Sequence, residues 1–197
     1  MEQTLAQTSK KELVEKTIQH TSKCSAKIFQ DLVNQELPSP QYKDFDCGTI
    51  GDYRKEDIIK SDEYRDFFNE LPNSKLPILY YFEIISDHSA QTVREALTKY
   101  KYAQGAKAVP AMKKTFDENS KILYVGKVKK IFWGRIIQHL GYYKVKRTQG
   151  LQLFHWAKPL GLKVRLHYYE FPQEMANFMT IVERAVAHEL RPISGRH

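Results

Sequence analysis

The sequence has few cysteines and no long apolar run. Cys24 and Cys47 are the only cysteines and do not form a CxxC pair, which excludes a disulfide framework and a zinc ribbon. No run approaches the ~18 consecutive apolar residues that a membrane-spanning helix requires. Residues 1–11 are too polar for a signal peptide. We therefore expect a cytoplasmic protein with reduced thiols and no membrane partner.

Internal repeats and low-complexity segments are also missing. The 197 residues, 42% of them hydrophobic, are sufficient for one domain with an elaborated end. Residues 1–75 are expected to form a helical extension, with apolar residues at helical spacing over 9–35 and again over 56–71. Residues 76–197 are expected to form the main domain, with an insertion at about 86–120.

The main domain is predicted to alternate strands and helices. Aromatic and β-branched residues predict strands at 76–85, 121–128 and 162–171. Helices are expected after Ser89 and at 131–140, 149–157 and 172–190. The predicted fold class is therefore α/β (α+β), a small three-stranded sheet flanked by helices.

Positive charge is concentrated in the second part of the chain. Residues 1–75 carry 11 Lys and Arg against 14 Asp and Glu, whereas residues 76–197 carry 20 against 9. Clustered cations suit a phosphate backbone, because each neutralised phosphate releases condensed counterions. The alternative is an ordinary solvated face. The residues expected to contact nucleic acid are Lys129, Lys130, Lys144, Lys146 and Arg147.

One glutamate lies beside a predicted buried stripe. In the last helix Met179, Val182, Val186 and Leu190 share an apolar face, and Glu183 lies at its margin. A carboxylate that is partly removed from water needs a cation, because a buried unpaired charge is costly. The alternative is an edge glutamate whose carboxylate reaches water.

A basic pair lies on another predicted helix. Arg135 and His139 are four residues apart, so both side chains lie on one face. Guanidinium groups bind phosphate oxygens through paired hydrogen bonds, and imidazole can transfer protons near neutral pH. The alternative is an ordinary surface pair.

Two tyrosines fall within predicted strands of the same small sheet. A buried hydroxyl needs a hydrogen-bond partner, so Tyr80 and Tyr124 indicate a polar cleft. The alternative is that both hydroxyls reach water at the ends of amphipathic side chains.

Together these residues resemble the GIY-YIG nuclease family. Ile78-Leu79-Tyr80 stands at the G-I-Y position, and Tyr124-Val125-Gly126 matches Y-I-G. Arg135 and His139 match the Arg and His of the helix that follows. Glu183 precedes Pro192 by the nine residues that the family has. The resemblance covers roughly residues 76–195.

The chain departs from the family pattern in several places. Ile78 replaces the first glycine, and Arg135 lies about one residue further from Tyr124 than is usual. About 35 residues separate the first two strands, and Ser194 and Gly195 follow the terminal proline where an Asn is usual.

The resemblance implies metal-dependent hydrolysis of a DNA phosphodiester, with duplex DNA as the expected partner. It implies that Glu183 holds Mg²⁺ or another divalent cation such as Mn²⁺. Tyr80 becomes the general base, and Tyr124 lines the cleft. Arg135 stabilises the transition state, with Lys127 as a further positive charge and His139 as a group that orients a hydroxyl or moves a proton.

The sequence is also compatible with two other functions. One is a nucleic-acid-binding or regulatory module that keeps the fold without catalysis. The other is a protein-interaction adaptor that uses the acidic helices of residues 1–75. His20 and Cys24 are also four apart on a predicted helix and could be half of a metal site, with no second half nearby in the sequence.

Overall fold

The computed structural model describes residues 2–34, 40–71 and 75–196. The chain divides into two compact units, residues 1–38 and 39–197. The first unit holds one helix, α1 (Glu2–Asn34), which covers residues 9–34 of the stretch expected to be helical, and residue 35 lies outside the described residues. The second, called the sheet unit below, contains every strand of the described chain and the candidate site. The boundary expected after residue 75 therefore falls inside the sheet unit.

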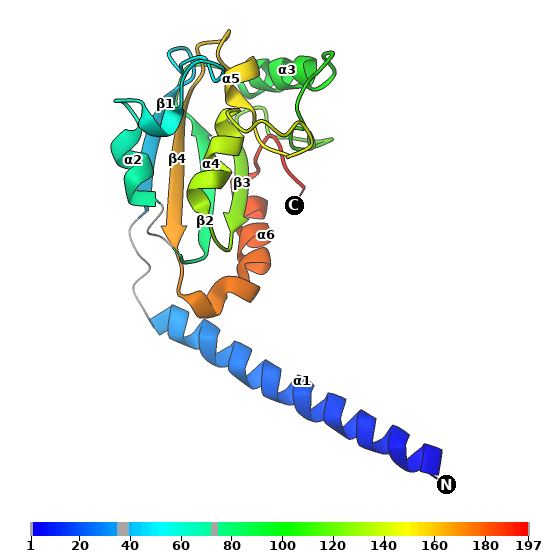
Figure 1. The fold of residues 1–197 in the computed structure, drawn as a ribbon. Coiled ribbons are helices and arrows are strands. Elements are labelled where there is room, and N and C mark those ends of the chain that lie inside the picture. The colour runs from blue at the N-terminus through cyan, green and yellow to red at the C-terminus, as the bar shows by residue number, and fades with distance from the viewer. Residues whose placement is uncertain (1, 35–39, 72–74, 197) are drawn as a thin grey trace. The chain divides into compact units, whose positions relative to one another are not determined.

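The sheet unit is built on four antiparallel strands rather than the three expected (Figure 1). Their order across the sheet is β1-β4-β2-β3. The strands are β1 (Gln41–Asp46), β2 (Ile78–Ile84), β3 (Ile122–Val128) and β4 (Lys163–Glu170). The prediction of a mixed α and β protein is confirmed, and the prediction of three strands is wrong.

The missed strand, β1, lies at the edge of the sheet beside β4. Its sequence QYKDFD has two aromatic residues among charged and polar ones, so it lacks the apolar run that marks a buried strand. Phe45 alone is fully buried, in ring contact with Tyr64. Asp44 and Asp46 pair instead with Arg165 and Lys163 of β4.

The helices match the prediction in part. The stretch expected as one helix over residues 56–71 is a short 3-10 turn, η1, followed by one and a half turns of α2. The last predicted helix is likewise split into η3 and α6, and α5 is shorter than expected. The observed helices are η1 (Ile58–Lys60), α2 (Arg65–Glu70), α3 (Ala90–Lys101), α4 (Phe132–Leu140), α5 (Leu153–Trp156), η3 (Gln173–Asn177) and α6 (Met179–Leu190).

Alternation along β2 places one row of side chains in the core. Ile78, Tyr80, Phe82 and Ile84 are each at most 2% exposed, as expected for positions that share a face of a strand. Helix α4 covers this face (Figure 1), and its Phe132 ring contacts Tyr80. The site therefore lies between α4 and the β2–β3 pair.

Helix α6 and the C-terminal segment lie against β3. The helix packs on β3 and β2, and after it the backbone N–H groups of Ile193 and Ser194 donate to the carbonyls of Ile122 and Leu123. This arrangement covers the free edge of β3, which would otherwise expose unpaired backbone groups.

No helix of the described residues has the length and apolar character needed to cross a membrane.

The net charge of the chain lies in one of the two units. Residues 1–38 carry five Lys or Arg and five Asp or Glu, so the whole net charge of +8 belongs to residues 39–197.

Candidate functional site

Tyr80 lies at the centre of the candidate site, fully buried within the sheet unit. It pairs across the strands with Gly126 of β3. A Cβ atom at position 126 would lie 2.5 Å from Tyr80 Oη and 2.6 Å from an edge carbon of Tyr124. Gly126 therefore leaves room for these two tyrosines, which a side chain at this position would displace.

Two side chains of α4 donate hydrogen bonds to the Tyr80 hydroxyl oxygen. Arg135 Nε donates at 3.0 Å, and His139 Nε2 lies 2.9 Å away. The backbone N–H of Leu151 donates to His139 Nδ1 at 3.1 Å, so the proton of the neutral ring is on Nε2. His139 therefore donates to Tyr80 and cannot accept its proton.

Arg135 connects Tyr80 to Tyr124. Its Nη2 donates to Tyr124 Oη at 3.3 Å, while Nη1 donates to Gln138 Oε1 at 2.9 Å and to the Gln149 carbonyl at 2.6 Å. Four of the five guanidinium N–H groups thus meet protein acceptors in the described structure. The guanidinium is held in one orientation, with one Nη2 proton left over.

We call Tyr80, Tyr124, Arg135 and His139 the tyrosine–arginine cluster. The family resemblance placed all four among the candidate catalytic residues, and in the structure direct hydrogen bonds join them. Helical spacing aligns the two α4 residues, and the pairing of β2 with β3 aligns the two tyrosines.

Burial controls the protonation states of the cluster. It raises the pKa of the Tyr80 phenol, and nearby Tyr124 adds to this effect while Arg135 opposes it. Burial also lowers the pKa of His139 well below 6.5, and the Arg135 charge lowers it further. At neutral pH the cluster therefore holds a phenol and a neutral imidazole.

Glu183 of α6 forms an ion pair with Lys127 of β3. Lys127 Nζ donates to Glu183 Oε2 at 2.7 Å, and the Glu183 side chain is 13% exposed. The negative charge of the carboxylate contributes to the raised pKa of Tyr80. The cation expected beside Glu183 is thus Lys127.

The donor set at Glu183 suits only one kind of metal site. The described residues contain no group of three or more His, Cys, Asp or Glu side chains that could enclose an ion. Mg²⁺ is commonly held by one or two carboxylates while it retains several waters. Glu183 fits such a site because Lys127 engages only Oε2.

The half of a metal site considered at His20 and Cys24 lies on α1. His20 Nε2 and Cys24 Sγ are 3.6 Å apart, and no group of three possible ligands is found among the described residues.

A basic groove is lined in part by residues that follow Glu183 in the sequence. This pocket, about 830 Å³ in volume, is lined by Lys113 and Lys114 from the predicted insertion and by Arg184, His188 and Arg191. The two arginines were missed, although Arg184 directly follows Glu183.

The lysines and arginine predicted to bind nucleic acid lie in two places. Lys129 and Lys130 follow β3, where Lys129 Nζ donates to Asn177 Oδ1 at 3.1 Å. Lys144, Lys146 and Arg147 lie in the segment after α4, and all three are exposed. Lys144 and Lys146 line a second pocket, described below.

Comparison with protein-family models, with curated proteins and with solved structures finds no match to this chain.

Proposed function

We propose that the chain is a metal-dependent endonuclease that hydrolyses phosphodiester bonds in DNA. The observation that carries the proposal is the convergence of Tyr80, Tyr124, Arg135 and His139 in one hydrogen-bonded cluster. The resemblance to the GIY-YIG family, drawn from the spacing of these residues, adds the reaction class.

Arg135 is proposed to stabilise charge that develops on the phosphate. A guanidinium already fixed by four protein acceptors needs no reorganisation when the transition state forms. Its remaining Nη2 proton is available to a non-bridging phosphate oxygen. Lys127 supplies a further positive charge.

Tyr80 is proposed as the general base for the attacking water. Two N–H donors on its oxygen favour the phenolate, while burial opposes it. Deprotonation therefore needs added positive charge at the site when substrate is bound. His139 acts as a positioning residue, because its Nδ1 is occupied by the Leu151 N–H.

Glu183 is proposed to hold the divalent cation, Mg²⁺ or Mn²⁺, through its carboxylate. The bound cation supplies positive charge that lowers the pKa of nearby hydroxyls and offsets charge on the phosphate. In this proposal Lys127 has to share or leave the carboxylate. The basic groove lined by Arg184 and Arg191 receives the DNA backbone beyond the cut.

A second candidate is a nucleic-acid-binding module without catalysis. The Lys127–Glu183 ion pair favours it, because the lysine already neutralises the carboxylate. The full burial of Tyr80 favours it as well, because a general base must reach water.

Plasmid nicking separates the two candidates. We expect conversion of supercoiled DNA to open circles with Mg²⁺, none in excess EDTA, and strong loss of nicking in Tyr80→Phe with DNA binding retained. Binding without metal-dependent nicking would instead establish the non-catalytic module. Nicking that persists in Tyr80→Phe would contradict the proposed base.

A further inference from the structure

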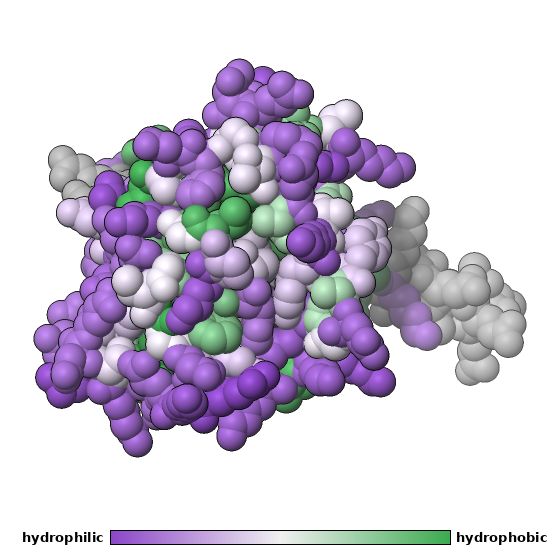
Figure 2. Space-filling model, turned by 90° about the horizontal axis from the view of Figure 1, so that it is seen from above, coloured by the Kyte–Doolittle hydropathy of each residue, from purple (hydrophilic) through white to green (hydrophobic). Residues whose placement is uncertain are grey.

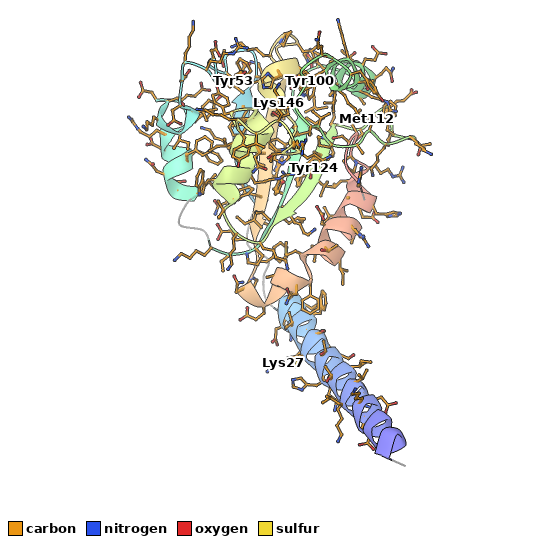
Figure 3. All side chains as sticks on the ribbon, turned by 45° about the vertical axis from the view of Figure 1, so that its right-hand side comes forward. Lys27, Tyr53, Tyr100, Met112, Tyr124 and Lys146 are labelled. Carbon is orange, nitrogen blue, oxygen red and sulfur yellow. The ribbon has the colours of Figure 1, made fainter. Side chains whose placement is uncertain are left out.

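A second pocket lies at the end of the sheet unit that carries α3 and α5. It has a volume of about 360 Å³, within the range of roughly 300–1,000 Å³ typical of small-ligand sites. Tyr53, Tyr100 and Lys146 gather at this end (Figure 3). Figure 2 views the molecule from this end and shows mostly hydrophilic side chains with small apolar areas between them.

Three aromatic rings line the pocket. Tyr100 and His155 are stacked with parallel planes, their ring centres 5.6 Å apart. Tyr53 meets the His155 ring edge-on at 5.1 Å. His155 Nε2 is buried and has no hydrogen-bond partner in the described structure. Such ring groups offer flat apolar contact to another aromatic ring.

A buried lysine supplies the charge at the pocket floor. Lys107 is 8% exposed, and its Nζ donates to the carbonyls of Gly141 at 2.7 Å and Tyr143 at 2.8 Å. The ammonium also lies 4.6 Å from the centre of the Tyr53 ring. None of its contacts in the described structure is a carboxylate, so its positive charge has no matching anion.

Further cations stand at the rim. Arg54, Lys144 and Lys146 line the same pocket. In the described residues no salt bridge is observed for Lys144 or Lys146, whereas Arg54 Nε donates to Tyr53 Oη at 3.3 Å and its charge interacts with that of Asp52. A cluster in which cations outnumber anions attracts an anion, and phosphate accepts hydrogen bonds from several such groups at once.

One short segment links the pocket to the tyrosine–arginine cluster. The segment after α4 carries Lys144 and Lys146, and further along it the Gln149 carbonyl accepts from Arg135 and the Leu151 N–H donates to His139. A ligand in the pocket therefore contacts the same segment that orients the candidate catalytic side chains.

We propose that this pocket, called the basic–aromatic pocket below, binds a nucleotide. The base stacks in the aromatic part, and the phosphate meets Lys107 and the rim cations. The proposal that the ligand is a nucleotide depends only on the residues of the pocket. The nucleotide could belong to a DNA strand beside the cut, which rests on the proposed nuclease function, or it could be a free mononucleotide.

The test is titration calorimetry on the full chain in EDTA, with deoxyadenosine 5′-monophosphate as the probe. We expect saturable binding, with deoxyadenosine and inorganic phosphate each at least about tenfold weaker because each lacks half of the contacts. Lys146→Glu should weaken binding about tenfold or more by replacing a cation with an anion. Lys99→Glu, a matched control at an exposed position of α3, should leave binding unchanged.

Each outcome decides the proposal. Absence of saturable binding, inorganic phosphate binding as tightly as the nucleotide, or no effect of Lys146→Glu would overturn it. Competition by a short single-stranded oligonucleotide assigns the site to a DNA strand, and no competition assigns it to a free nucleotide. Glu183→Gln should bind the probe like the wild type, so this result is independent of whether the chain cuts DNA.

Discussion

The tyrosine–arginine cluster and the basic–aromatic pocket use similar residue types in opposite ways. In the cluster, Arg135 donates to four protein acceptors and the Tyr80 oxygen receives two donors. In the pocket, Lys107 has two carbonyl acceptors and a ring but no anion, and His155 Nε2 has no partner in the described residues.

The difference indicates that fixed side chains and unmatched charges suit two different roles, catalysis and ligand binding. Side chains held by several hydrogen bonds are preorganised, which suits stabilisation of a short-lived transition state. Cations without a matching anion are stabilised when they bind one, which suits binding of a stable ligand. We therefore expect substitutions in the cluster to change rates and substitutions in the pocket to change affinity.

The largest expected effect comes from removing the guanidinium. Arg135→Ala should lower the single-turnover cleavage rate on the order of 10²-fold or more, because the preorganised charge at the phosphate is lost. Arg147→Ala, an exposed residue of the neighbouring segment, should lower affinity and the salt dependence of binding while the rate stays near that of the wild type. Equal effects of both substitutions on the rate would remove the distinction between the two regions.

Overpacking the cluster should also be costly. Gly126→Ala places a methyl group 2.5 Å from Tyr80 Oη, and we expect a loss of about 1–3 kcal/mol in the free energy of unfolding. Gly134→Ala on α4, where the nearest atom is a side-chain methyl of Ile131 at 3.2 Å, should be close to neutral because alanine favours helix. Urea denaturation of both variants gives the comparison, and a neutral Gly126→Ala would show that the tyrosines do not pack as described.

Acid should weaken the fold through His139. Its pKa is lowered well below 6.5 in the folded protein by burial, so the unfolded chain binds a proton that the folded chain does not. The free energy of unfolding is therefore highest above pH 6.5 and falls as the pH drops below 6.5. From pH 7 to pH 5 we expect a loss on the order of 2 kcal/mol from this residue.

The matched measurement is the same pair of unfolding curves for His139→Gln. Its loss between pH 7 and pH 5 should be smaller than that of the wild type, although not zero, because the pKa of His155 is also lowered by burial. An identical loss in both proteins would show that His139 is not the neutral, buried group described above.

The smallest expected effect is that of removing residues 1–38. These residues carry equal numbers of positive and negative side chains and form a unit of their own. The slope of log K against log salt for duplex DNA should therefore stay unchanged. Removal of residues 1–75 should abolish folding instead, because it deletes β1. A lost salt slope after the shorter deletion would place DNA contacts on α1.

The sequence predicted the parts of the molecule that follow strong local patterns. The runs around Tyr80 and Tyr124 predicted β2 and β3, Ser89 caps α3 by accepting from the Thr92 N–H, and Gly141 ends α4 with a φ of 97°. Strand β1 was not predictable, because an edge strand with polar side chains lacks both an apolar run and strict alternation.

The sequence likewise predicted some parts of the candidate site and not others. The helical spacing of Arg135 and His139 predicted that they share one face of a helix, and the family resemblance grouped them with the two tyrosines. The sequence predicted a cation near Glu183 but could not select Lys127, which is 56 residues away. The basic–aromatic pocket was missed because Tyr53, Lys107 and His155 come from three distant segments that only the tertiary structure brings together.

The proposal that Glu183 holds a catalytic metal is tested by comparing Glu183→Gln with the wild type in one nicking experiment. The amide keeps the size of the side chain and removes its negative charge. The account predicts that Mg²⁺-dependent nicking is lost while DNA affinity, measured in EDTA, stays within about twofold of the wild type. Nicking by Glu183→Gln at the wild-type rate would contradict it.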